Sequence, residues 1–139
     1  MISSVSDVPP NAAVEDLGAR LIALERAALD RWGRGDPSGF LEISAPEVTY
    51  FEPFLESRLD GLEALSRHYE DLRGKVRIDR YEIHAPKVHH AGEMAVLSFA
   101  FRSYGGNDRH HWNCTEVYRR MEGQWKIVHT HWSIVQPIK

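Results

Sequence analysis

The period of the hydrophobic pattern changes once along this chain, at Gly74. Before this glycine, apolar residues recur at helical spacing, for example Leu17, Leu21 and Leu24. After it, apolar and polar residues alternate over long stretches, which is typical of half-buried strands. A chain of 139 residues with helices first and strands afterwards favours a single α+β domain, in which a curved antiparallel sheet wraps around the helices.

Capping and turn residues divide the two halves into elements. The expected elements, in chain order, are a helix over 11–32, a short helix over 37–45, a strand over 48–51, a helix from the capping box of Asp60 and Glu63 to Arg73-Gly74, and strands over 76–89, 93–104, 110–121 and 124–135. Residues 1–10 are polar and contain two prolines, which predicts a flexible arm ahead of a domain over 11–139.

The last hairpin predicts which side chains share a face of the sheet. A two-residue turn at Glu122-Gly123 pairs Met121 with Gln124, and counting back places Glu116 opposite His129. Cys114 then lies opposite His131. In this register one face, directed toward the helices, carries eight residues: Trp112, Cys114, Glu116, Tyr118, Trp125, Ile127, His129 and His131.

The strand over 93–104 has two different sets of alternate residues. We expect Arg102 to point inward, in line with the small residues at 96, 98 and 100, where it leaves space for a ligand. The opposite set is then outward, and it is strongly apolar: Ala95, Leu97, Phe99 and Phe101. Because such a surface does not stay exposed, this arrangement predicts a homodimer that is buried through the sheet.

Charge and composition exclude several classes of function. The net charge is −3, which argues against nonspecific binding to nucleic acid, and the longest apolar run, 95–101, is too short to cross a membrane. The single cysteine, Cys114, cannot form an intramolecular disulfide, and the N-terminus lacks the pattern of a secretory signal. We therefore expect a cytoplasmic protein.

A series of short strings resembles the association domain of calcium/calmodulin-dependent protein kinase II from about Leu24 to Ser133. The strings are Gly35-Asp36, Tyr50-Phe51-Glu52-Pro53, Asp60-Gly61, His68-Tyr69-Glu70-Asp71-Leu72, Val88-His89, Ala91-Gly92-Glu93, Glu122-Gly123-Gln124-Trp125 and Val128-His129-Thr130-His131. The resemblance implies the cone-shaped nuclear transport factor 2-like fold, a pocket, and homodimerisation through the outer face of the sheet. The wider group includes SnoaL-like cyclases, steroid Δ-isomerases and scytalone dehydratase.

This resemblance suggests roles for particular residues. In the steroid isomerases the general base is an acidic residue followed by proline after the first short strand, and Glu52 matches it. Their protonated aspartate lies near Glu116, whereas their oxyanion tyrosine falls at Ala28. The pocket of the kinase association domain is lined by arginines; Arg102 falls at one of these positions and Glu116 occupies another.

Three residues are therefore candidates for acid–base catalysis: Glu52, Glu116 and His129. Each has a structural alternative, since Glu52 could cap a strand end and the other two could form a polar pair. The expected ligand-binding residues are Tyr50, Arg102, Trp112, Tyr118 and His131. The His129-x-His131 spacing could hold a metal with His110 or Cys114 nearby, but the pattern is weaker than that of a typical metal site, so we expect neither metal nor cofactor.

Two functions from different classes fit this sequence. The first is a SnoaL-like or steroid-isomerase-like pocket protein that binds a small apolar, carbonyl or carboxylate ligand. If it is an enzyme, it is an isomerase, cyclase or dehydratase that works by acid–base chemistry; a passive carrier would use the same pocket. The second is a noncatalytic oligomerisation module like the kinase association domain.

Overall fold

The computed structural model describes residues 10–135, with side chains from residue 16 onward. The elements are α1 (Pro10–Trp32), α2 (Ser38–Glu42), β1 (Ser44–Phe51), β2 (Leu59–Asp60), α3 (Leu62–Leu72), β3 (Arg80–Ala91), β4 (Met94–Gly105), β5 (Asp108–Met121) and β6 (Gln124–Ile134). The α+β prediction is confirmed. The arm expected over 1–10 lies, except for Pro10, outside the described residues.

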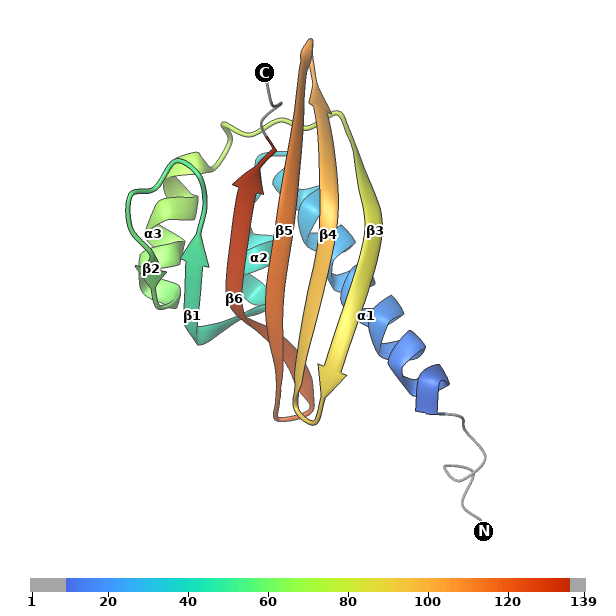
Figure 1. Cartoon of the computed structure of the whole chain (residues 1–139). Helices are drawn as coiled ribbons and strands as arrows, with labels where there is room; N and C mark the ends of the chain where they lie inside the picture. Colours follow the sequence, from blue (N-terminus) through green and yellow to red (C-terminus); the bar gives the residue numbers. More distant parts are fainter. Residues whose placement is uncertain (1–9, 136–139) are drawn as a thin grey trace.

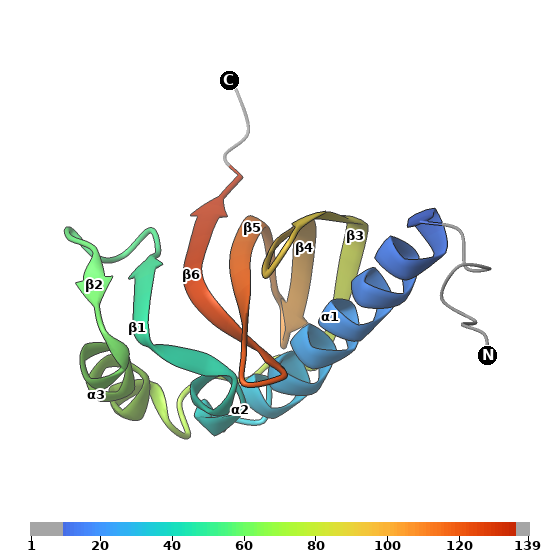
Figure 2. The same cartoon turned by 90° about the horizontal axis from the view of Figure 1, so that it is seen from below.

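All six strands form one sheet in the order β2-β1-β6-β5-β4-β3 (Figure 1). Strands β3 to β6 are an antiparallel meander, as expected, but β1 pairs with β6 in parallel, so the first long strand lies beside the last. The three helices lie on one side of the curved sheet (Figure 2). The core therefore lies between the helices and the face of the sheet that they cover, which we call the inner face.

Strand β4 is oriented opposite to the sequence prediction. The apolar residues Ala95, Leu97, Phe99 and Phe101 are buried at 0–5% exposure and join the core with Leu21 and Leu29 of α1. Arg102 is exposed on the far side of the sheet, so its predicted inward position is wrong. The reason is the hydrophobic effect: burial of two phenylalanines and a leucine outweighs any burial of an arginine.

A β-bulge in β6 corrects the predicted register of the last hairpin. Met121 pairs with Gln124 and Tyr118 with Ile127, as expected, but Val117 pairs with His129 because Val128 is an extra residue. Beyond this point every side chain of β6 lies on the face of the sheet opposite to the one that the sequence predicted. Glu116 therefore lies opposite Thr130, and the predicted pairs of Glu116 with His129 and of Cys114 with His131 are wrong.

We call the side of the sheet away from the helices the outer face. Its middle is made of small or uncharged residues, and most of the histidines of the chain lie around them. The outer-face residues of β3 to β6 include Glu82, His84, His89, Val96, Ser98, Ala100, Arg102, His111, Asn113, Thr115, Val117, His129 and His131. Thr49 and Phe51 of β1 continue this face beside His129 and His131.

Candidate functional site

The inner face of the sheet and the helices enclose a cavity of about 460 Å³. It lies between the C-terminal end of α1, α3, the end of β1 and the adjoining ends of β4, β5 and β6. Eight aromatic residues from seven elements and the β1–β2 loop line it: Trp32, Phe40, Tyr50, Phe54, Tyr69, Phe101, Trp112 and Trp132. A volume of this size and an aromatic lining suit a small, mainly apolar ligand.

A carboxylate and an imidazole meet in the wall of this cavity. Glu52 directly follows β1, and its Oε1 lies 3.3 Å from Nε2 of His68 on α3. Both side chains are mostly buried, at 12% and 21% exposure, yet both line the cavity. The second oxygen of Glu52 accepts a hydrogen bond from the backbone N–H of Phe54 at 3.3 Å, which holds the carboxylate in place.

Sequence reasoning missed His68, although its spacing contained the signal. His68 follows the buried Leu65 by three positions and precedes the buried Tyr69 by one, so it lies on the inner side of α3. Its Nε2 is buried and has no hydrogen bond of good geometry among the described residues. The nitrogen is therefore free to interact with a ligand or with Glu52.

Two tyrosines lie beside this pair. The rings of Tyr50 and Tyr69 are perpendicular, with centroids 5.5 Å apart, and Trp32 packs against Tyr69 at 5.0 Å. Burial raises the pKa of both phenols, so both stay protonated at neutral pH. A protonated phenol in a cavity wall can donate a hydrogen bond to a carbonyl oxygen of a ligand.

The sheet side of the cavity is formed by two tryptophans. The rings of Trp112 and Trp132 are 6.1 Å apart, and Phe54, which is 73% exposed, reaches Trp112 at 6.2 Å. Trp132 points inward only because of the bulge at Val128, so its place in the wall could not be read from a regular hairpin.

The predicted site residues thus fall into three groups. Glu52, Tyr50 and Trp112 line the cavity, and their part in binding or catalysis stays a prediction. Glu116 and Tyr118 lie on the inner face, where they are fully buried, and they do not line the cavity. Arg102, His129 and His131 lie on the outer face, so their predicted orientation toward an internal ligand is wrong.

Glu116 is a buried acid with an incomplete hydrogen-bond set. One carboxyl oxygen accepts the hydroxyl of Thr130 at 3.0 Å, and the other has no partner among the described residues. Burial raises the pKa of Glu116 to about 8. The neighbouring Tyr118 hydroxyl and both carboxyl oxygens of Glu25 on α1 are likewise buried without a partner in the described part of the chain.

A family model described as the calcium/calmodulin-dependent protein kinase II association domain matches residues 19–136, which is most of the chain. The chain belongs to this association-domain family. The resemblance inferred from the sequence is thereby confirmed, and with it the nuclear transport factor 2-like fold. None of the curated proteins matches the sequence.

The solved structures similar to this chain include candidate enzymes and kinase association domains. A candidate ketosteroid isomerase from Parabacteroides distasonis is 42% identical; 86% of this chain and 88% of that one are covered, with a TM-score of 0.78. The association domain of the Caenorhabditis elegans kinase is 20% identical over 86% and 96% of the chains, with a TM-score of 0.73. A candidate dehydratase from Streptomyces avermitilis is 21% identical over 93% and 100%, with a TM-score of 0.70.

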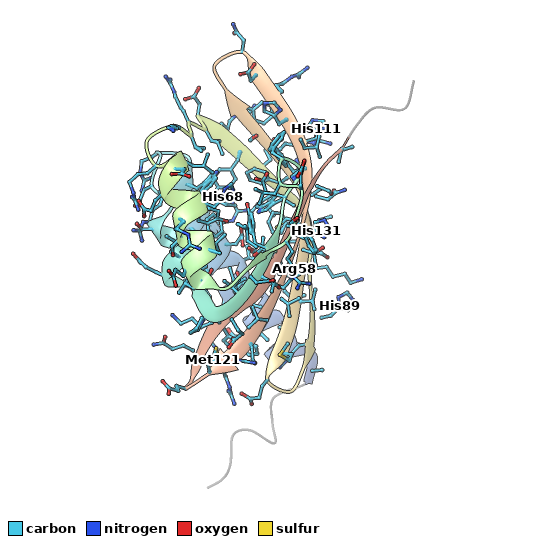
Figure 3. The ribbon with its side chains drawn as sticks, turned by 90° about the vertical axis from the view of Figure 1, so that its left-hand side faces the viewer. Arg58, His68, His89, His111, Met121 and His131 are labelled. Atoms are coloured by element: carbon cyan, nitrogen blue, oxygen red, sulfur yellow. The ribbon has the colours of Figure 1, made fainter. Side chains whose placement is uncertain are left out.

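The outer face of the association domain carries a group of imidazole and aromatic rings. His129 Nδ1 lies 2.7 Å from the hydroxyl of Thr49, and Phe51 contacts the rings of His129 and His131 at 5.7 and 5.1 Å. Burial, together with the positive charges of His131 and Arg58, lowers the pKa of His129. Figure 3 shows His131, His89 and His111 on this side of the sheet, whereas His68 lies on the side of the helices.

Residues 10–135 contain neither a cluster of metal-binding side chains nor a membrane-spanning helix. Within that range, no three histidine, cysteine, aspartate or glutamate side chains are grouped so that they could hold a metal ion. Among the described helices, none combines the length and the hydropathy needed to cross a membrane.

Proposed function

We propose that this protein binds a small, mainly apolar carbonyl compound in the aromatic cavity and moves a proton on it with Glu52 and His68. The observation that carries the proposal is the 3.3 Å approach of a carboxylate and an imidazole in the wall of a cavity of about 460 Å³. The 42% identity with a candidate ketosteroid isomerase supports acid–base chemistry of this kind.

The geometry suggests a division of roles. The Glu52 carboxylate, fixed by the N–H of Phe54, accepts a proton from carbon next to the carbonyl group. The protonated phenols of Tyr50 and Tyr69 donate to the carbonyl oxygen as negative charge develops there. His68 contacts Glu52 and orients it, and the apolar rings around the pair keep water away from the exchange.

The test uses β,γ-unsaturated ketones, from single rings to fused rings, as probes. Isomerisation to the conjugated enone is followed by ultraviolet absorbance, and binding by tryptophan fluorescence, because three of the four tryptophans line the cavity. We expect Glu52→Gln to lower turnover by about 100-fold or more while binding persists. Glu56→Gln, which alters an exposed carboxylate in the same loop, is the matched control and leaves turnover unchanged.

Two results would contradict this proposal in different ways. Unchanged turnover in Glu52→Gln would remove Glu52 as the base. Binding of the β,γ-unsaturated ketones without any turnover by the natural chain would leave a carrier instead of an enzyme. If no probe alters the fluorescence, the cavity does not bind this class of ligand.

We further propose that the protein associates with a second copy of itself through the outer face. The family match supports this function, and so does the size of the surface. Strands β3 to β6 are 11–14 residues long, so the outer face measures roughly 40 by 19 Å, or about 750 Å². A stable dimer typically buries about 800 Å² on each partner. Sedimentation of a monomer at 100 μM protein would contradict self-association.

A further inference from the structure

Five of the eight histidines of the chain lie on the outer face: His84, His89, His111, His129 and His131. They come from three strands and surround a centre of small or uncharged residues at positions 96, 98, 100, 113, 115 and 117. On the inner side, by contrast, only His68 and His110 contribute to the cavity. This distribution places titratable groups where a second copy would meet the sheet.

Four of these histidines have no carboxylate beside them. Among the described residues, the only histidine–carboxylate approaches within 4 Å are those of His68 with Glu52 and of His84 with Glu82. Protonation of His84 is therefore compensated by Glu82 at 3.2 Å. Protonation of His89, His111, His129 or His131 adds a positive charge that no neighbouring acid offsets.

The other charged groups of this face are already mostly basic. The basic residues on or bordering it are Arg58, Arg80, Lys87, Arg102, Arg109, Arg119 and Lys126, and the acidic residues are Glu47, Asp60 and Glu82. All three acids are engaged: Glu47 with Arg119, Asp60 with Arg58, and Glu82 with His84, Tyr104 and Arg80. A histidine of this face that takes up a proton therefore lies among basic residues, and the nearby acids already have partners.

We propose that protonation of His89, His111, His129 and His131 separates two copies of the chain that associate through their outer faces. This inference rests on the self-association proposed above. In a two-fold interface the same surface meets itself, so each added positive charge approaches an equally charged copy. The neutral imidazoles, together with Phe51, instead form a surface that can be buried. The occupant is a second copy because the face has the area of a dimer interface and the family match points to self-association.

The His129 environment on balance agrees with this direction. Burial and the neighbours His131 and Arg58 disfavour a positive charge on His129, and they outweigh the contact of its Nδ1 with Thr49 at 2.7 Å, which acts in the opposite sense. Burial of the face against a second copy would strengthen this preference for the neutral ring. By linkage, association is then strongest where the histidines are neutral and weakens as pH falls through their titration range.

The experiment is sedimentation velocity of the full chain over a concentration series at pH 8.0 and pH 5.5 and at one ionic strength. We expect the dimer dissociation constant to rise by about tenfold or more at pH 5.5, since several histidines without acidic partners take up protons together. Circular dichroism at both pH values checks that the fold persists.

The fourfold glutamine variant His89→Gln, His111→Gln, His129→Gln and His131→Gln should still dimerise at pH 8.0 and lose most of the pH dependence. The control is His90→Gln, which removes an exposed histidine near Trp125 outside this face. This variant should keep the pH dependence of dimerisation. Should the fourfold variant not fold, His131→Gln and His129→Gln are measured separately, each with a reduced pH dependence expected.

The outcomes separate the two proposals. A chain that is monomeric at both pH values contradicts self-association itself. A dimer whose dissociation constant is the same at both pH values, or a pH response that the glutamine variants retain, leaves self-association standing and overturns the histidine mechanism.

Discussion

At the scale of single residues, the buried Glu116 links stability to pH. A carboxyl whose pKa is raised by burial to about 8 in the folded protein keeps its proton over a range in which the unfolded chain has lost it. The folded state therefore binds more protons between about pH 4.5 and 8, and the free energy of unfolding falls as pH rises through this window. The slope reaches about 1.4 kcal/mol per pH unit for one such group.

We predict that Glu116→Gln removes this slope. The amide oxygen can still accept the hydroxyl of Thr130, and an amide carries no charge to be buried. Urea unfolding should show the variant to be more stable than the natural chain at pH 8, with the two converging near pH 5. Because the other titrating groups are common to both proteins, they cancel in the difference. A difference that does not change with pH would contradict the buried-acid interpretation.

At the scale of elements, one extra residue in β6 decides which side chains form the cavity. Val128 has no partner in β5, and it sends Trp132 inward against Phe99 and Phe101, at 5.9 and 5.4 Å. Deletion of Val128 removes only the unpaired residue, so His129 should still pair with Val117 and Trp132 should stay inward in a ladder without the bulge. We expect this deletion to cost less stability than Trp132→Ala, which removes a large aromatic packed on the core and should lower the free energy of unfolding by about 3 kcal/mol.

The matched control for this deletion is Val128→Ala, which keeps the chain length and the bulge. Val128 is only half-buried, so truncation of its side chain should cost about 1 kcal/mol or less. Denaturant unfolding compares the two. A deletion variant that loses as much stability as Trp132→Ala would contradict the assignment of Val128 as the extra, unpaired residue of β6.

The same bulge marks how far the sequence could predict the site. The order of helices and strands, the turn at Glu122-Gly123 and the inward position of Glu52 follow from periodicity, turn chemistry and resemblance. Beyond Val128 the prediction was wrong, because both residue sets of β6 contain polar and aromatic side chains and neither one is obviously buried. In β4 the apolar set was clear, and the error came from reserving inner space for Arg102.

Strand β3 shows a similar limit. Pro86 within a predicted strand indicates an edge or a bulge, and the structure has both: β3 is the last strand of the sheet, and its pairing is interrupted between His84 and Lys87. Ala85 adopts a positive φ of 51° at this interruption. The sequence pattern predicted one continuous strand over 76–89, so this interruption was not predicted, and the strand resumes in a register that keeps Val88 inward.

At the scale of the whole molecule, the parallel pairing of β1 with β6 has a consequence for folding. Thr49 meets His129, which is 80 residues away in the sequence, so this contact closes a loop that includes α3 and the meander. Closure of a long loop costs entropy before the contacts that repay it have formed, and proteins rich in such contacts fold slowly.

A chain that ends at Met121 should therefore lack cooperative unfolding, although it retains all three helices and five of the six strands. Glu52 and Trp132 belong to the two segments that this closure joins, so a nascent chain presents no finished chamber until β6 has been synthesised. A compound that binds in this chamber would stabilise only the fully assembled state and none of the earlier folding intermediates.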